Sequence, residues 1–242
     1  MVAADRWRRT RALITIARAA WFLALLLLAA SARGESRCFG TVSDGRIEES
    51  VRLPSRGSNF EAYSALGVAA GRTHVHSKVA AIVVAACADL AAETPSAKYV
   101  YGETGWQSGG RIQPHRTHQN GLSVDFFVPI RNGEGESVPL PTTFSNRFGY
   151  DVEFDARARS TDLRIDFAAL AEHLYRLHRA AKSRGVRIER VIFDSAYLTE
   201  LFSTRHGPYL RDHLPFMKRR PWIRHDEHYH VDFAIACRPK AG

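Results

Sequence analysis

The stretch H-R-T-H-Q-N-G-L-S-V-D at residues 115–125 places His118 and Asp125 seven positions apart. Gly121 between them lets the chain bend, and the apolar V-D-F-F-V that begins at Val124 predicts a buried strand. The stretch therefore predicts a loop histidine close to a strand aspartate. Imidazole nitrogens and carboxylate oxygens are common ligands of catalytic zinc, which takes three protein ligands and leaves a fourth position open.

A second cluster, R-H-D-E-H-Y-H at residues 224–230, carries the histidines that would complete such a site. His228 and His230 alternate with Tyr229, and residues i and i+2 of a strand point to the same face of a sheet. A single histidine is more often a hydrogen-bonded loop or core residue than a ligand. Five histidines and an aspartate in two short clusters instead favour one metal site where the clusters meet.

The first 32 residues have the pattern of a secretory signal peptide. Four arginines at residues 6–11 precede an unbroken apolar run at 19–30, and A-S-A at 30–32 provides small residues for cleavage. The apolar run has 12 residues, fewer than the ~20 that a membrane-spanning helix needs, so cleavage is favoured over a retained anchor. Arg8 and Arg9 also match a twin-arginine export signal. We expect a periplasmic protein with no stable membrane anchor after cleavage.

The remaining residues, 33–242, suffice for a single domain with a sizeable core. The whole chain has a formal net charge of +9, and loss of residues 1–32 removes five basic residues and one acidic residue, leaving +5. The lysines and arginines are scattered rather than gathered in the stripe typical of nucleic-acid-binding proteins, so we expect no nucleic-acid partner. A basic exported protein suits an anionic cell wall or membrane surface.

Three cysteines, Cys38, Cys87 and Cys237, lie in this domain. An oxidising compartment allows one disulfide and leaves one thiol over. We favour the pair Cys38 and Cys237, which would join the two ends of the domain. Cys87 lies within the apolar, helix-like V-V-A-A-C-A-D-L and is expected to be an inert buried thiol.

The hydrophobic patterns predict an α+β fold, with a small central antiparallel sheet that carries the zinc site and is flanked by helices and long loops. Helices are expected from a cap at Ser77 to residue 94, from a cap at Asp166 to Gly185, and from Ser195 to Phe202. Strands are expected at 98–101, 124–128, 186–194 and 228–237, and loops at 33–60, 102–111, 131–143 and 205–224. The histidines that we expect to be bystanders are His74, His76, His173 and His178.

These motifs resemble those of the penicillin-insensitive murein endopeptidases, within the wider group of lysostaphin-like, D-Ala-D-Ala-cleaving and hedgehog-like zinc proteins. The shared patterns are H-x-x-H-Q-x-G-x-x-V-D-[IF]-F at 115–127, H-x-x-H-x-H-V at 225–231, G-E-x-x-x-x-x-G-G-R at 102–111 and S-D-G-R-I at 43–47. The resemblance implies that His118, Asp125 and His230 bind one catalytic zinc ion. It also implies that His228 is the base or transition-state stabiliser, with His225 and His115 close to the metal.

The chain departs from the family pattern at three places. An Asp-x-x-His pair that can help to hold a second metal has its best match at Asp155 and Ala158, which makes a second site doubtful. Ser123 replaces the aspartate before V-D, and V-D-F at 231–233 replaces Val-Arg-Leu. We expect the last two changes to affect substrate specificity.

The resemblance implies a zinc-dependent peptidoglycan hydrolase that cleaves the cross-link amide between D-alanine and meso-diaminopimelate. Zinc held by two imidazoles and one carboxylate keeps a positive charge, lowers the pKa of water toward ~7 and polarises the scissile carbonyl. Neither G-x-S-x-G nor S-x-x-K occurs in the chain. Attack by water would explain insensitivity to penicillin, which acylates serine.

Two alternatives remain open. A D,D- or L,D-metallo-carboxypeptidase that trims wall stem peptides would use the same three ligands. A non-catalytic, zinc-stabilised wall-binding protein would keep the ligands without turnover, as hedgehog-like relatives do. The presence of His228, His225 and His115 argues for catalysis, because a structural zinc site needs none of them and is usually closed by four protein ligands.

Overall fold

The computed structural model describes residues 34–219, 221 and 223–240. The chain divides into two compact units, Met1–Glu35 and Ser36–Gly242, and the elements that follow belong to the second unit. The predicted signal peptide and its alternative, a membrane anchor, both lie outside the described residues. Among the helices in the described part of the chain, none combines the length and the apolar character that a membrane crossing requires.

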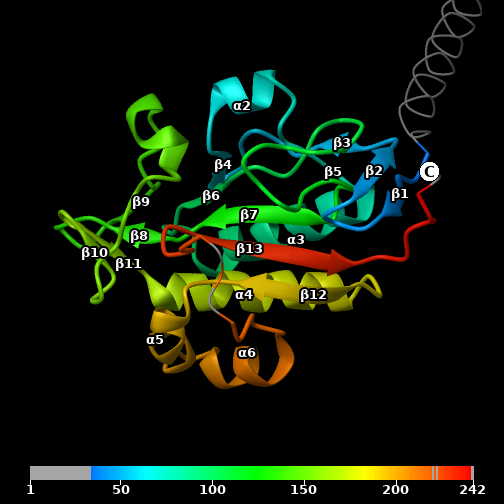
Figure 1. The fold of residues 1–242 in the computed structure, drawn as a ribbon. Coiled ribbons are helices and arrows are strands. Elements are labelled where there is room, and N and C mark those ends of the chain that lie inside the picture. The colour runs from blue at the N-terminus through cyan, green and yellow to red at the C-terminus, as the bar shows by residue number, and fades with distance from the viewer. Residues whose placement is uncertain (1–33, 220, 222, 241–242) are drawn as a thin grey trace, which may run out of the picture. The chain divides into compact units, whose positions relative to one another are not determined.

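A five-stranded sheet forms the centre of this unit (Figure 1). The strand order is β12-β13-β7-β6-β4, and neighbours run antiparallel except for the parallel pair β4 and β6. The strands are β12 (Arg187–Ile192), β13 (His228–Ala234), β7 (Ser123–Phe127), β6 (Tyr99–Tyr101) and β4 (Phe60–Ala62). The predicted α+β fold is confirmed, and all these strands except β4 coincide with predicted segments.

The central strands β7 and β13 have one apolar face and one polar face, because side chains alternate along a strand. The apolar face joins the hydrophobic core through Val124, Phe126, Tyr229, Val231 and Phe233. On the polar face, His230 lies opposite Asp125, and Asp232 lies opposite Ser123. The residues of both sequence clusters therefore meet on one face of adjacent strands.

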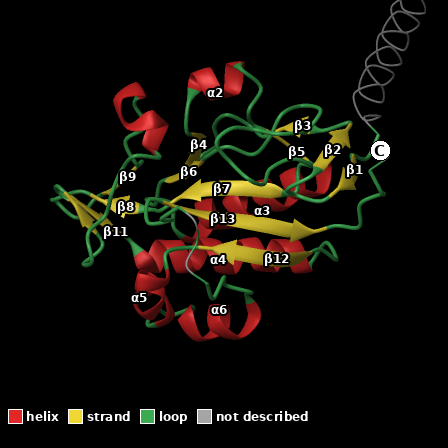
Figure 2. Ribbon diagram, in the orientation of Figure 1, coloured by secondary structure: helices red, strands yellow, loops and turns green. Residues whose placement is uncertain are grey.

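Two long helices pack against each other beside these strands, α3 (Ser77–Glu93) and α4 (Phe167–Lys182) (Figure 2). The side chain of Asp166 caps α4 as predicted, since its Oδ1 accepts a hydrogen bond of 3.0 Å from the backbone nitrogen of Ala169; such caps stabilise helices by about 1 kcal/mol. For α3 the predicted cap was wrong. Nδ1 of His76, one residue before Ser77, accepts from the backbone nitrogen of Lys78.

Short elements occupy parts of the predicted loops at 33–60, 131–143 and 205–224, where that prediction is wrong, and also segments for which no element was predicted. Strands of two to four residues are too short to show a period of two, so no pattern reveals them. The strands are β1 (Arg37–Gly40), β2 (Gly45–Glu48), β3 (Val51–Arg52), β5 (His74–Val75), β8 (Ile130–Arg131), β9 (Ser137–Val138), β10 (Arg159–Ser160) and β11 (Leu163–Ile165). They form the sheets β1-β2, β3-β5 and β10-β11-β8-β9.

The short helices are α2 (Ala65–Ala69), the 3-10 helix η1 (Phe144–Gly149), and α6 (Gly207–His213), which lies in a predicted loop. The predicted helix at 195–202 consists of a 3-10 turn, η2 (Ser195–Tyr197), followed by α5 (Leu198–Phe202). The elements α2 and η1 matter for function because residues of both line the cavity described below.

The predicted disulfide between Cys38 and Cys237 is confirmed. It links β1 to the segment that follows β13, so both ends of the described unit are tied together. Cys87 is a free, buried thiol in α3, as predicted. Burial raises the pKa of this thiol to about 12, which makes it unreactive at neutral pH.

Candidate metal centre

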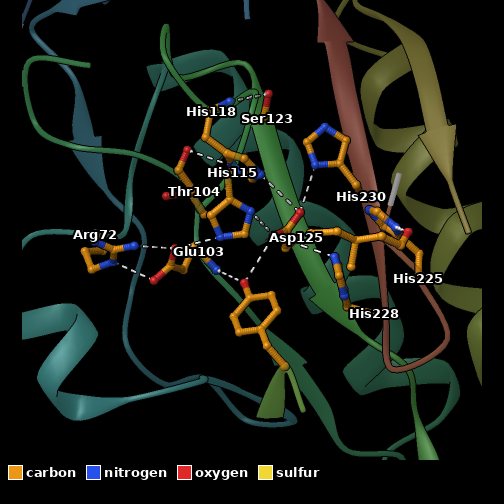
Figure 3. Close-up of polar contacts among 12 residues, drawn as sticks. Arg72, Glu103, Thr104, His115, His118, Ser123, Asp125, His225, His228 and His230 are labelled. Carbon is orange, nitrogen blue, oxygen red and sulfur yellow. Dashed lines mark hydrogen bonds and ion pairs between the residues drawn. The ribbon is translucent and has the colours of Figure 1, made fainter. Parts of the chain in front are cut away.

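Asp125 is the residue on which the site converges (Figure 3). Its Oδ1 lies 2.8 Å from Nδ1 of His230 and 3.2 Å from Nε2 of His118, and its Oδ2 accepts a hydrogen bond of 3.1 Å from the hydroxyl of Tyr150. Burial alone would raise the pKa of Asp125, but its interactions with the surrounding imidazoles, His118 first and then His228, hold it well below its ordinary value. A buried carboxylate that stays ionised is suited to binding a cation.

His118 reaches Asp125 from the preceding loop, as predicted. Gly121 allows the bend: it has a φ of +76°, and a Cβ there would lie 2.8 Å from the backbone nitrogen of His76. Nδ1 of His118 lies 3.2 Å from the carbonyl oxygen of Thr104, which can only accept, so Nδ1 carries the proton. Nε2 is buried without a hydrogen-bond partner among the described residues, and burial lowers the pKa of the ring. An unprotonated, buried nitrogen beside a carboxylate fits a metal ligand.

His115 lies on the same side of Asp125, with its ring centroid 4.8 Å from that of His118. Its Nδ1 is 3.5 Å from Oδ2 of Asp125, and its Nε2 is 2.8 Å from Oε2 of Glu103. Among the described residues, His115, His118 and Asp125 form a candidate metal group whose ligand atoms all lie within 4.8 Å of one another. The predicted triad contains His230 in place of His115, and this assignment stays a prediction.

Glu103, which was not predicted as a site residue, holds His115 in place. Arg72 donates to both carboxylate oxygens of Glu103, over 2.5 and 2.7 Å, and the hydroxyl of Tyr63 donates over 2.9 Å. Burial alone would raise the pKa of Glu103, but the hydrogen bonds from His115 and Arg72 lower it to about 2. Its place in the G-E-x-x-x-x-x-G-G-R pattern was the signal that pointed to it.

His230 approaches Asp125 from the other side, on β13, and is held between two carboxylates. Nδ1 contacts Asp125, and Nε2 lies 2.7 Å from Oδ1 of Asp232. Burial alone would lower the pKa of His230, but the charge of Asp232 raises it to about 10. His230 is therefore protonated beside Asp125, and a metal ion would replace the proton on Nδ1.

His228 and His225 complete the group of predicted histidines. Nε2 of His228 lies 4.0 Å from Oδ2 of Asp125, and its Nδ1 lies 2.7 Å from Oε1 of Glu227. The ring of His225 is 4.5 Å from that of His228, and its Nδ1 donates to the carbonyl of Ile223. Burial lowers the pKa of His228 to about 4 and that of His225 to about 3, so both rings are neutral at neutral pH.

Tyr150 bridges the two histidine clusters, and no sequence pattern indicated it. Its ring centroid lies 5.5 Å from that of His115 and 5.2 Å from that of His228. Its hydroxyl accepts a hydrogen bond of 2.9 Å from the backbone nitrogen of Glu103 while it donates to Asp125. The residue follows η1, where the chain turns sharply because Arg147 and Phe148 have φ values of 49° and 57°.

The site forms one wall of a cavity of ≈ 680 Å³, which His115, Asp125, His225, His228 and His230 all line. Three of the four large apolar side chains that are exposed in the described residues also line it, with exposed fractions of 67% for Leu66, 85% for Phe144 and 51% for Ile223. Such a concentration of exposed apolar surface indicates a binding site.

Ser123 and Asp232, two residues at which the chain departs from the family pattern, contact each other. Ser123 Oγ donates to Oδ1 of Asp232 over 2.6 Å, and neither residue is among those that line the cavity. Asp155, the proposed partner in a second metal site, accepts hydrogen bonds from the backbone nitrogens of Arg157 and Arg159 within its own turn. Ala158 is buried in the hydrophobic core.

Comparison with known proteins agrees with the motifs. The model of a family described as penicillin-insensitive murein endopeptidase matches residues 38–241. The matched region contains both histidine clusters, Glu103, Tyr150 and the disulfide. A comparison with curated proteins found no match.

Proposed function

The chain belongs to the penicillin-insensitive murein endopeptidase family, and we propose that it is a zinc-dependent hydrolase that cuts the peptide cross-links of peptidoglycan. The bond is the amide between D-alanine and meso-diaminopimelate. One observation carries this proposal. Both histidine clusters converge on the buried carboxylate of Asp125, at the wall of a cavity. Residues 1–32 direct export, and the protein acts in the periplasm.

Zinc fits the donor atoms that the chain provides. Nε2 of His118, the carboxylate of Asp125 and Nδ1 of His230 would hold the ion, and His115 lies close enough to contribute. Imidazole ligands favour zinc over calcium or magnesium, which prefer oxygen ligands throughout. Once bound, zinc would polarise the scissile carbonyl and lower the pKa of a water molecule toward ~7.

His228 is placed to move the proton. It shares one face of β13 with His230, and its Nε2 faces the carboxylate of Asp125 while Glu227 holds Nδ1. A neutral imidazole in this position takes a proton from the attacking water, and general acid–base catalysis of this kind accelerates reactions by roughly 10²- to 10⁴-fold. His225, beside His228, and His115, on the other side of Asp125, are placed to pass that proton on to the leaving amine.

The cavity lining supports water as the nucleophile. Among the described residues that line the cavity there is neither a serine nor a cysteine. Ser123, which lies on β7 two residues before Asp125, directs its hydroxyl to Asp232 instead. A lining of this kind offers penicillin no serine to acylate, which accords with the name of the family.

The experiment uses the protein purified after export, with a cross-linked muropeptide dimer as substrate. We expect near-stoichiometric zinc, conversion of the dimer to two monomers, loss of activity after chelation and recovery with added Zn²⁺, all unchanged by penicillin. A protein that digests the dimer equally well without metal would contradict the proposal. Release of a terminal D-amino acid from a monomeric pentapeptide, with the dimer left intact, would instead identify a carboxypeptidase. Wall binding without either reaction would identify a binding protein.

A further inference from the structure

A buried carboxylate stands directly behind the metal group. Asp232 is 2% exposed and lies on β13 two residues beyond His230, on the same face of the strand. Its Oδ1 lies 2.7 Å from Nε2 of His230, the ring nitrogen that points away from Asp125. Asp232 therefore contacts the imidazole of His230, which the proposed function assigns to the metal.

Asp232 is itself fixed from both neighbouring strands. Arg190 on β12 donates to Oδ2 through Nε, over 2.9 Å, and Nη2, over 2.5 Å, and Ser123 on β7 donates to Oδ1 over 2.6 Å. The register pairs Arg190 with Asp232 and Asp232 with Ser123, so the three residues form one row across the sheet. A carboxylate at this depth needs such partners to stay ionised.

We infer that Asp232 is a positioning residue for the metal site, and that Arg190 and Ser123 hold it in that role. By accepting the proton on Nε2 of His230, Asp232 fixes the tautomer and the ring orientation that turn Nδ1 toward Asp125. Partners of this kind orient metal-bound histidines and raise their basicity, and their loss typically weakens metal affinity by about 10- to 100-fold. The inference rests on the proposed zinc-dependent function.

A purely structural role is the competing explanation, because a buried ion pair between adjacent strands also affects folding. The chain offers a matched control on α4. Glu172 is a buried carboxylate that contacts an arginine and a histidine, with Nε of Arg176 at 2.7 Å and Nε2 of His206 at 2.7 Å. None of these three residues lines the cavity, so Glu172→Gln disturbs a comparable network at a different place.

The test measures Zn²⁺ affinity by competition with a chromogenic chelator, without substrate, for the wild type, Asp232→Ala, Asp232→Asn and Glu172→Gln. Urea unfolding of each metal-free protein reports stability separately. We expect Asp232→Ala to bind Zn²⁺ about 10- to 100-fold more weakly. Asp232→Asn, which keeps an acceptor oxygen, should fall between Asp232→Ala and the wild type. Glu172→Gln should lose stability but bind Zn²⁺ as tightly as the wild type.

Three outcomes decide the matter. Wild-type Zn²⁺ affinity in both Asp232 variants would overturn the inference and leave the metal-dependent function standing. An equal loss of Zn²⁺ affinity in Glu172→Gln would overturn it as well, since the effect would then follow stability. A wild-type protein that binds no Zn²⁺ would overturn the proposed function together with the inference. If Asp232→Ala does not fold, Asp232→Asn decides alone, because its shape matches that of aspartate.

Discussion

Asp125 and His230 face each other across the adjacent strands β7 and β13, with Oδ1 2.8 Å from Nδ1, although 105 positions separate them in the sequence. The contact joins the two histidine clusters and places two of the three proposed ligands on strands that the hydrophobic core holds from the other side. Ligands on paired strands are held more rigidly than ligands on loops, so each side chain of the site can be tested for a separate role.

Asp125 and His228 should separate metal binding from turnover. Asp125→Ala removes the carboxylate that both clusters share, and we expect it to abolish zinc binding and activity together. His228→Ala should keep near-stoichiometric zinc and lower kcat by roughly 10²- to 10⁴-fold, because it removes the proton acceptor. Both variants are checked by elemental analysis of their zinc content and by measurement of kcat on the muropeptide dimer. Loss of zinc in His228→Ala would show that His228 is a metal ligand instead.

His230 and His115 are the two alternatives for the third metal ligand. We expect His230→Ala to lower zinc affinity by more than the roughly 10- to 100-fold that loss of an outer-shell partner costs, because a ligand itself is removed. His115→Ala should retain the metal, because Glu103 already holds Nε2 of His115. Isothermal titration with Zn²⁺ for both variants decides the assignment. The reverse result would place the metal in the group of His115, His118 and Asp125.

Phe144, with 85% of its surface exposed at the cavity, should contribute to substrate binding. We expect Phe144→Ala to raise KM for the muropeptide dimer several-fold and to leave kcat and zinc affinity near the wild-type values, since it lies apart from the reacting groups. Val84→Ala is the control, because Val84 is 41% exposed on α3 and does not line the cavity. Equal effects in both variants would argue against a contact between Phe144 and substrate.

His173 should make folding stability depend on pH. It is buried behind β13, where its Nδ1 accepts a hydrogen bond from the hydroxyl of Tyr229, and burial lowers its pKa to about 3. The unfolded chain binds a proton at His173 below pH ~6.5, whereas the folded chain does not until pH ~3, so stability falls as the pH drops through this window.

Between pH 7.5 and 5.0 this contribution amounts to about 2 kcal/mol. The variant His173→Leu should lose that part of the pH dependence, whatever its stability at neutral pH. Urea unfolding of the wild type and the variant at both pH values checks this. Parallel changes of the free energy of unfolding in the two proteins would show that His173 does not titrate on unfolding.

Local patterns predicted the parts of the site that lie on strands. H-x-H alternation indicated that His228 and His230 share a face, and V-D-F-F-V indicated the strand of Asp125. Glu103 and Tyr150 were missed because each reaches the site from an irregular segment, where spacing carries no information about direction. Asp232 was interpreted as a specificity difference, whereas the strand register places it behind His230, and only pairing across the sheet reveals this.

The place of β13 in the sheet has a consequence for timing. This strand follows all the other described strands in the chain, yet it lies between β12 and β7. Until residues 228–234 have left the ribosome, β7 lacks its neighbour β13, and His118 and Asp125 lack the second cluster. A growing chain without these residues therefore lacks the complete site. The proposed activity can arise only when nearly the whole chain has been synthesised.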